Sequence, residues 1–272
     1  ITGRASGTGA LTGTIGAPRA DLLADIEAID VPRLPLRDAK LTLSFMRRPD
    51  GSAGVVALTA ASDYGLAAAR SAFRFPRGGV DLSDLSVNAG GLSASGAVSL
   101  RRSTPSAADL QVQLVKGAFL DAGEIKGTAK IVDAAGGPRA TLDLTADSAI
   151  LPGSRVALRS GRITANGPLD QLPYQADLQG LSASERWNLT GGGTFSSGKA
   201  GYQLTFNGGG RYGRRDLKTV EPAVLRMGGG ERSARLRLAA SDGGLIDLDA
   251  RLGKDDTDID AQVRRLGLSL LN

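Results

Sequence analysis

The sequence predicts an all-β protein: one long, mostly antiparallel sheet, curled lengthwise into a U-shaped trough with an apolar groove. Apolar and polar residues alternate with a period of two over most of the 272 residues, which is typical of strands with one buried face. The 38 glycines and the aromatic content of 4% suit many short strands joined by turns. No apolar run approaches the roughly 18 residues of a membrane-spanning helix.

The clearest hairpin lies between residues 125 and 146. Alternation runs through Ile125–Ile131, stops at the loop Ala134–Gly137 and resumes through Ala140–Ala146. This loop predicts that Ile131 lies opposite Ala140, and a slip of one residue would turn every apolar side chain to the wrong face.

A second hairpin is predicted near the end of the chain. Ala234–Ala240 and Ile246–Leu252 flank a turn at Asp242–Gly243. This register sets Arg237 opposite Asp247, which is a favourable cross-strand charge pair.

Two assignments are less direct. Ala20–Asp30 has apolar residues at both helical and strand spacing, and we favour a strand because Pro32 follows closely and the neighbouring segments are strands. Taking Pro105 as the break between two strands places Val98 opposite Val112. In total we expect about seventeen strands, and we expect residues 1–272 to be one continuous segment of a longer protein.

The composition argues against several kinds of chemistry. The chain has no Cys and no His, so disulfides, thiolate or imidazole metal sites, and Ser-His or Cys-His nucleophiles are excluded. Asp256, Asp258 and Asp260 alternate as in a straight strand, whereas calcium loops curve around the ion. We therefore expect no catalytic residues, no metal and no cofactor, and no enzymatic activity.

One segment resembles a phosphate-binding loop. Residues 193–199 match its spacing, but Ala200 stands where Ser or Thr is needed, and the strand Tyr202–Phe206 follows where a helix is needed. We interpret the segment as a turn.

The net charge of +5 raises the question of nucleic acid. Single-strand binders place aromatic side chains beside basic ones, and here only Arg211–Tyr212 combines the two. We expect a solvated basic surface and no nucleic-acid partner, although attraction to anionic lipid headgroups stays possible.

An open sheet of this size would leave its apolar face in water unless a ligand or a partner covers it. Folding lengthwise into a trough shelters that face, and seventeen strands would give a groove on the order of 80 Å long. Small and branched aliphatic residues suit acyl chains, which such a groove would hold by contact area. The predicted groove-lining residues are Leu41, Leu43, Phe45, Val98, Leu100, Val112, Leu114, Ile125, Ile131, Leu142, Leu144, Leu178, Leu204, Phe206, Leu236, Leu238, Ile246 and Leu248.

Several short motifs carry a family resemblance. Asn166–Leu178 contains Gly-Pro-Leu-Asp at a strand start and resembles a signature of the TamB and AsmA-like family of translocation and assembly module proteins. Leu34–Leu43, Val80–Leu85 and Leu92–Gly96 are similar to the same family, and Leu266–Leu271 resembles the start of a further repeat.

This resemblance implies a β-taco groove that carries phospholipid between the inner and outer membranes in support of outer-membrane biogenesis. It implies a periplasmic protein of a Gram-negative bacterium, anchored in the inner membrane by a segment outside this chain. The implied partners are phospholipid acyl chains and, through other regions, the BamA-like outer-membrane barrel TamA.

Two alternatives stay open. The chain could bind unfolded outer-membrane barrel strands at a sheet edge, as a chaperone working with the BamA-like partner. It could also be an outer-membrane β-barrel itself, although one Trp, four Tyr and six Phe are few for the aromatic girdles of a barrel.

Overall fold

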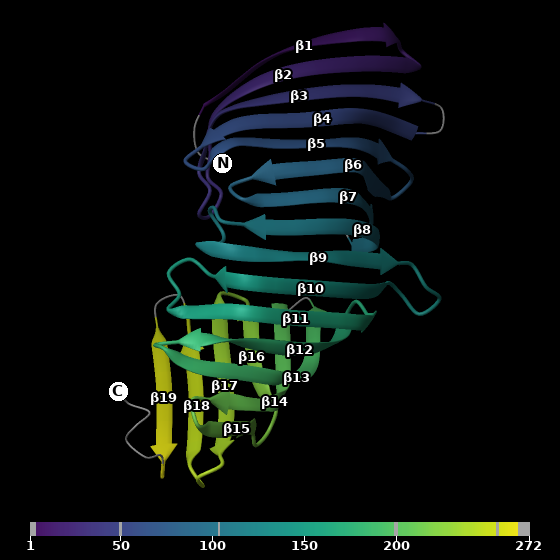
Figure 1. Ribbon diagram of the computed structural model, residues 1–272. Helices are drawn as coiled ribbons and strands as arrows, with labels where there is room; N and C mark the ends of the chain where they lie inside the picture. Colours follow the sequence, from purple (N-terminus) through teal and green to yellow (C-terminus); the bar gives the residue numbers. More distant parts are fainter. Residues whose placement is uncertain (1–3, 49–50, 103, 199–200, 254–255, 266–272) are drawn as a thin grey trace. The chain divides into compact units, whose positions relative to one another are not determined.

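The computed structural model describes residues 4–48, 51–102, 104–198, 201–253 and 256–265 (Figure 1). These residues form one antiparallel sheet of 19 strands, and no helix occurs among them. The predicted all-β class and antiparallel pairing are therefore confirmed. In the described ranges no helix is long and apolar enough to cross a membrane.

The chain divides into two compact units, and each is described by itself. Unit 1 comprises residues 1–138 and 149–154, and unit 2 comprises residues 139–148 and 155–272. The strands of unit 1 are β1 (Ala5–Thr14), β2 (Ala17–Ile29), β3 (Leu36–Arg48), β4 (Gly51–Ser62), β5 (Gly65–Phe75), β6 (Gly79–Ala89), β7 (Leu92–Arg101), β8 (Thr104–Val115) and β9 (Ala122–Val132).

Unit 2 holds the remaining strands, including most of β10. They are β10 (Arg139–Ile150), β11 (Val156–Pro168), β12 (Gln171–Ser182), β13 (Glu185–Gly198), β14 (Gly201–Tyr212), β15 (Arg215–Thr219), β16 (Ala223–Gly228), β17 (Glu231–Ala240), β18 (Leu245–Leu252) and β19 (Thr257–Arg264).

The strand pairing in unit 1 gathers apolar side chains on one face, which we call the inner face. Each strand from β1 to β8 pairs with the next one along the chain. Paired residues point to the same face, so one row of neighbours crosses all nine strands. That row is Leu11, Ala20, Phe45, Gly54, Phe73, Leu82, Val98, Ala108 and Ile131.

A small core closes the inner face of unit 1 along one edge, by which we mean the row of strand ends and connections on one side of the unit. Ala39, Ala60 and Ala67 lie on strand ends at this edge, and the β2–β3 connection packs Leu34 against them. The β8–β9 connection adds Ala118, whose N–H donates to the carbonyl of Gly90 at 2.8 Å. The two connections together cover this edge with apolar side chains.

Unit 2 has a matching apolar face, which we also call its inner face. One row of paired residues runs across seven strands from β12 to β19 and contains no polar side chain. That row is Leu172, Phe195, Leu204, Leu225, Ala234, Ala250 and Ile259, in which β14 is followed by β16.

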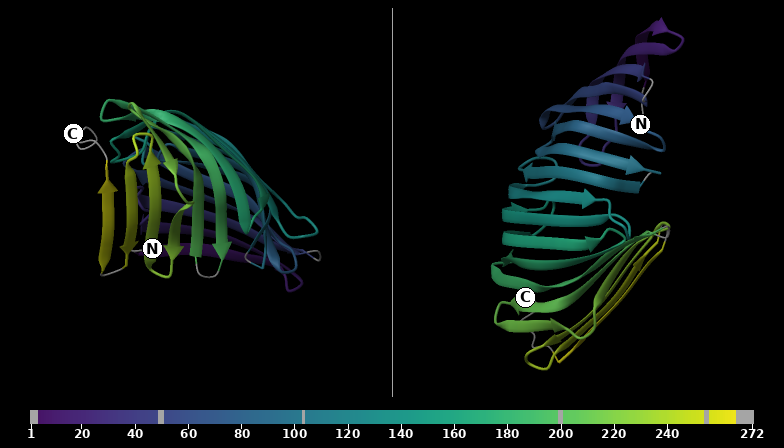
Figure 2. Two further views of the ribbon diagram at one scale, coloured as in Figure 1. Left: turned by 90° about the horizontal axis from the view of Figure 1, so that it is seen from below. Right: turned by 90° about the vertical axis from the view of Figure 1, so that its right-hand side faces the viewer.

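The sheet of unit 2 bends where β15 and β16 meet. Both strands pair with β14 and β17, so they are two halves of one strand position, broken at Val220–Pro222. Pro222 has no N–H to give to a ladder, which favours a break there. Beyond the bend, β16–β19 run across β11–β13 instead of alongside them (Figure 2).

Most of the strand predictions hold, with identifiable exceptions. Ala20–Asp30 is strand, because β2 covers all of it but Asp30. The expected total of about seventeen strands is too low. The alternation-based count omits β1, β15 and β16, and it splits β11 in two at a β-bulge after Leu158.

The predicted opposition of Val98 and Val112 is wrong. Val98 pairs with Ala108, and Val112 pairs with Ala94. Pro105 does not break the chain but pairs with Leu100 inside β8, so the turn lies before it and the register moves. The turn at Ala134–Gly137 is present, with a 2.9 Å hydrogen bond from the N–H of Gly137 to the carbonyl of Ala134. The pairing predicted between Ile131 and Ala140 stays a prediction.

Leu34→Ala tests the core at the closed edge of unit 1. Leu34 is 4% exposed, so its truncation should lower the free energy of unfolding by about 2–4 kcal/mol. The control is Leu11→Ala, at a side chain that is 78% exposed, with an expected change of about 0.5 kcal/mol or less. Urea unfolding followed by circular dichroism measures both, and equal effects would contradict this assignment of the core.

Candidate functional site

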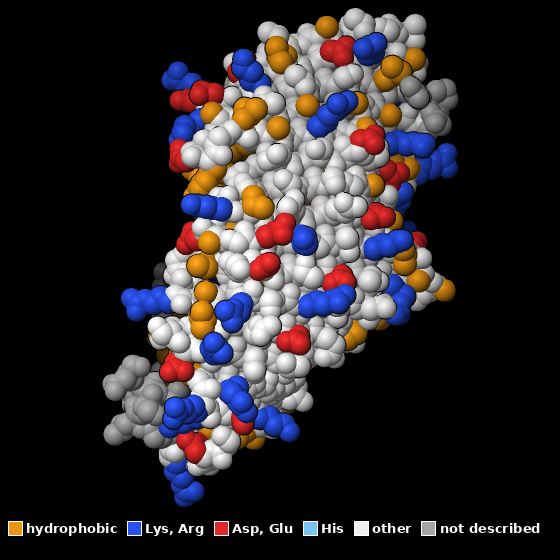
Figure 3. Space-filling model, viewed as in Figure 1, with side chains coloured by type: hydrophobic (Ala, Val, Ile, Leu, Met, Phe, Trp, Pro, Cys, Tyr) orange, Lys and Arg blue, Asp and Glu red, His pale blue; other side chains and the backbone are white. Residues whose placement is uncertain are grey.

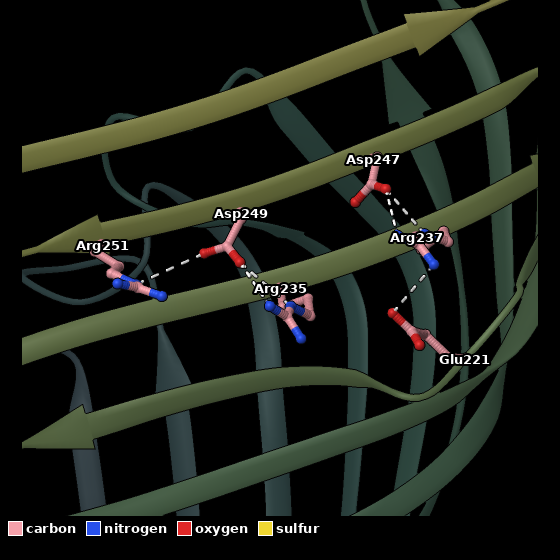
Figure 4. Close-up of polar contacts among 6 residues, drawn as sticks. All are labelled: Glu221, Arg235, Arg237, Asp247, Asp249 and Arg251. Atoms are coloured by element: carbon pink, nitrogen blue, oxygen red, sulfur yellow. Dashed lines mark hydrogen bonds and ion pairs between the residues drawn. The ribbon is translucent and has the colours of Figure 1, made fainter.

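The outer face of unit 2 carries ordered ion pairs. Arg237 Nη2 lies 2.7 Å from Asp247 Oδ2, and Arg235 Nη2 lies 3.0 Å from Asp249 Oδ2, as the predicted register requires (Figure 4). Glu221 is a second carboxylate beside Arg237, at 3.9 Å. Hydrogen bonding to Asp247 raises the pKa of Arg237 above its ordinary value. The predicted cross-strand charge pairing is confirmed.

The residues predicted to line a groove are placed on the opposite face in both units. In unit 1 they lie on β3, β7, β8 and β9, and in unit 2 on β10, β12, β14, β17 and β18. For β10, Asp143 forms an ion pair with Arg162 on the outer face, so Leu142 and Leu144 point the other way by alternation. All 18 residues are partly exposed. A second layer of structure packed on this face would bury most of these residues. Because they are partly exposed instead, this apolar face is accessible to solvent.

Unit 2 contains an apolar cavity of about 450 Å³ on its inner face. Trp187 and Leu189 of β13, Leu217 of β15, and Leu236 and Leu238 of β17 contribute to its walls. β14 pairs with β13 and β15, and β15 also pairs with β17, so the inner-face side chains of these adjacent strands surround one space at the bend. A cavity of this volume with mostly apolar walls is typical of sites for small apolar ligands.

Glycines make room for this cavity. Gly208 and Gly210 of β14 have inner-face positions and line it. A Cβ on Gly210 would collide with the backbone carbonyl of Asn188, and one on Gly208 would approach the ring of Phe206 to 2.8 Å. The segment Gly208–Gly210 thus lies within a strand where two backbones come close, whereas Gly229 and Gly230 lie in the turn between β16 and β17.

Tyr174 stabilises the sheet near the cavity. It pairs with Gly193, and its hydroxyl reaches past this glycine to donate to the carbonyl of Thr205 at 2.7 Å. The N–H of Thr194 donates to the Thr205 hydroxyl at 3.0 Å, so side chains replace part of the β13–β14 ladder. Burial raises the pKa of Tyr174 above its ordinary value.

Trp187 lines the cavity, and an ion pair between Arg215 and Asp242 lies beside Tyr212, another lining residue. The indole N–H of Trp187 is buried and has no hydrogen-bond partner among the described residues. Arg215 shares an inner-face row with Tyr212, and its Nε lies 3.1 Å from Asp242 Oδ2. Because Trp187 is the single tryptophan of the chain, its fluorescence reports on this cavity alone.

The motifs dismissed from the sequence show no built site. Within the described residues no group of three acidic side chains is placed to hold a metal ion, and Asp258 and Asp260 lie on the extended strand β19. Of the segment resembling a phosphate-binding loop, residues 193–198 belong to β13 and the strand β14 follows, while residues 199–200 lie outside the described residues. Leu266–Leu271 also lies outside them.

Comparison of this chain with protein-family models, curated proteins and solved structures found no match.

Gly210→Ala tests the close backbone approach at the cavity. The added methyl group must displace the β13 backbone, so we expect a loss of about 1–3 kcal/mol in the free energy of unfolding. Gly198→Ala is the control, because a Cβ there meets nothing within 4 Å. Chemical unfolding followed by Trp187 fluorescence measures both variants, and an unchanged Gly210→Ala protein would contradict the packing described.

Tyr174→Phe tests the hydroxyl that bridges two strands. Its loss should cost about 0.5–1.5 kcal/mol at neutral pH. Because burial raises the folded pKa, this phenol contributes stability that is complete below about pH 10 and declines as the pH rises through the folded value. The variant should therefore lose less stability than the parent at alkaline pH. Tyr202→Phe, at a side chain 55% exposed, is the control, and identical pH profiles would contradict this role.

Proposed function

We propose that this chain is a segment of a bridge-like carrier that moves phospholipid along an apolar groove between the inner and outer membranes. In this proposal the sheet curls lengthwise into a trough of the β-taco kind, and the chain is a member of the TamB and AsmA-like family. Its role is transport and support of outer-membrane biogenesis, without catalysis.

One observation carries the proposal: each unit has a continuous apolar face whose side chains stay partly exposed. The rows that contain Phe45 and Val98 in unit 1, and Leu204 and Leu225 in unit 2, cross from strand to strand without a charged residue. Charged pairs such as Arg237 and Asp247 lie on the other face, and the pair of Arg215 and Asp242 lies at the end of an inner-face row beside Tyr212. A soluble protein does not leave apolar surface of this extent uncovered unless something binds there.

The composition of the inner face also suits movement of a bound acyl chain along it. Each buried methylene group contributes about 0.8 kcal/mol wherever it lies on an aliphatic surface. Since Leu, Val, Ala and Gly repeat along the rows, an acyl chain would meet a similar environment at successive strands. Apolar contact would hold the acyl chain with a similar free energy at every position, so no position would bind it much more tightly than the next.

The cellular setting follows from the same proposal. The chain would lie in the periplasm of a Gram-negative bacterium and be tethered to the inner membrane by a segment outside it. The BamA-like barrel TamA would act with it at the outer membrane through other regions, and neither nucleic acid nor a cofactor would take part.

A second candidate function has one observation in its favour. Every residue of β1 and of β19 is exposed, which would make these strands accessible for pairing with an extended chain. A chaperone for unfolded barrel strands would use such edges. A photoreactive residue placed in β1 or β19 that crosslinks to an unfolded barrel protein, and not to lipid, would favour this function.

The lipid proposal is tested by quenching the fluorescence of Trp187 with phospholipid brominated in its acyl chains. Bound acyl chains should quench this single tryptophan. Leu189→Asp places a charge in the cavity wall and should weaken the apparent affinity by about tenfold or more, because a carboxylate without a partner is costly in apolar surroundings.

Thr190→Asp is the matched control. It adds the same charge at the next residue along β13, which is exposed, pairs with Asp177 on the outer face and does not line the cavity. Absence of quenching in the folded parent, or equal weakening by the two variants, would reject an acyl-binding inner face. Circular dichroism confirms that each variant is folded.

A further inference from the structure

The two edges of the inner face in unit 1 differ in kind. Since the strands form an antiparallel meander, the β2–β3, β4–β5, β6–β7 and β8–β9 connections lie at one edge. This edge is closed by the apolar packing of Leu34, Ala39, Ala60 and Ala118. The β3–β4, β5–β6 and β7–β8 turns lie at the opposite edge (Figure 1).

Arginines gather at that opposite edge. Arg47 lies near the end of β3, Arg77 lies in the β5–β6 turn, and Arg102 lies in the β7–β8 turn; all three are exposed. Within the described part of the chain the structure records no ion pair for any of them. Figure 3 shows Lys and Arg side chains along this edge and others along the opposite one. The turns are about 10 Å apart, because each is separated from the next by two strands.

The charge at this edge is not cancelled by nearby acids. Asp81 is held by Arg101, with Oδ1 2.6 Å from Nη1, and this hydrogen bond lowers the pKa of Asp81 below its ordinary value. The N–H of Arg102 donates to the carbonyl of Gly78 at 3.0 Å, so two arginine-bearing turns are in direct contact. Arg48 and Asp50 add one charge of each sign to the sequence of the β3–β4 turn.

Apolar and cationic side chains meet on the inner face at this edge. Arg47 pairs with Ser52, which pairs in turn with Phe75, so all three point to the same face. Phe75 is 44% exposed and packs edge-on against Phe73, with ring centroids 5.3 Å apart. A ligand that is apolar at one end and anionic at the other would match this boundary.

We propose that phospholipid lies across the inner face of unit 1 in one orientation, with its headgroup phosphate at the edge of Arg47, Arg77 and Arg102. The acyl chains point toward the closed edge at Leu34 and Ala118. Guanidinium groups bind phosphate oxygens through paired, charge-assisted hydrogen bonds, and successive turns offer successive headgroups a place. This inference rests on the proposed function and adds to it an orientation and a preference for anionic headgroups.

The orientation is tested with two photoreactive forms of phosphatidylglycerol and the full chain. One form carries the photoreactive group on the headgroup, the other at the end of an acyl chain, and crosslinked peptides are identified by mass spectrometry. The headgroup probe should label the turns around Arg47, Arg77 and Arg102, and the acyl probe should label the segments around Leu34 and Ala118.

The outcomes separate the two proposals. Acyl labelling of the inner face with headgroup labelling at the closed edge, or equally at both edges, would overturn the orientation and leave acyl binding intact. Absence of labelling by both probes in a folded sample would overturn acyl binding, and the orientation with it.

Charge variants test the headgroup contacts directly. The triple variant Arg47→Gln, Arg77→Gln, Arg102→Gln should bind phosphatidylglycerol about tenfold more weakly, with a reduced dependence on salt. The matched control Lys40→Gln, Arg70→Gln, Lys130→Gln removes the same charge from exposed, outward-facing positions and should change binding by about twofold or less.

Two further results would overturn the headgroup assignment. One is equal weakening by the two triple variants, which would mean that net charge alone matters. The other is displacement of the lipid by inorganic phosphate at comparable concentration, which would mean that the arginines bind free phosphate instead of a headgroup attached to a bound chain.

Discussion

The backbone ladder between consecutive strands is the interaction on which the rest of the structure depends. The described residues include no helix that could pack on the apolar faces, so each strand is held mainly by its neighbours. An antiparallel ladder also requires paired residues to share a face. Alternation within one strand therefore becomes a continuous apolar surface across many strands.

Beta-bulges keep that surface continuous where the alternation fails. In β6 the sequence Leu82-Ser83-Asp84-Leu85 places two leucines three residues apart, which would turn one of them outward in a regular strand. The register shifts between these leucines, and Asp84 adopts a positive φ of 50°, so that Leu82 pairs with Val98 and Leu85 with Gly96. The irregularity preserves a single apolar face.

Much of the candidate site follows from this pattern. The pairing of Arg237 with Asp247 could be predicted because the short turn between their strands allows only one register. Val98 does not lie opposite Val112, because Pro105 lies inside β8 near its start, where a proline is tolerated and does not break the strand. The structural roles of Tyr174 and Trp187 could not be predicted from the sequence, because they depend on glycines of neighbouring strands that leave space for the two rings.

The sequence by itself determined the strand class, the antiparallel order of neighbours and the face on which most apolar side chains lie, because these are local consequences of period two and turn length. Only the tertiary structure decided where the sheet of unit 2 bends, which strands share its cavity and which edge of unit 1 is closed. Those features depend on residues far apart in the chain that come together, such as Leu34 and Ala118 in one core and Trp187 and Leu238 in the walls of one cavity. Local alternation carries no information about such contacts, because a flat sheet and a bent one satisfy the same ladder.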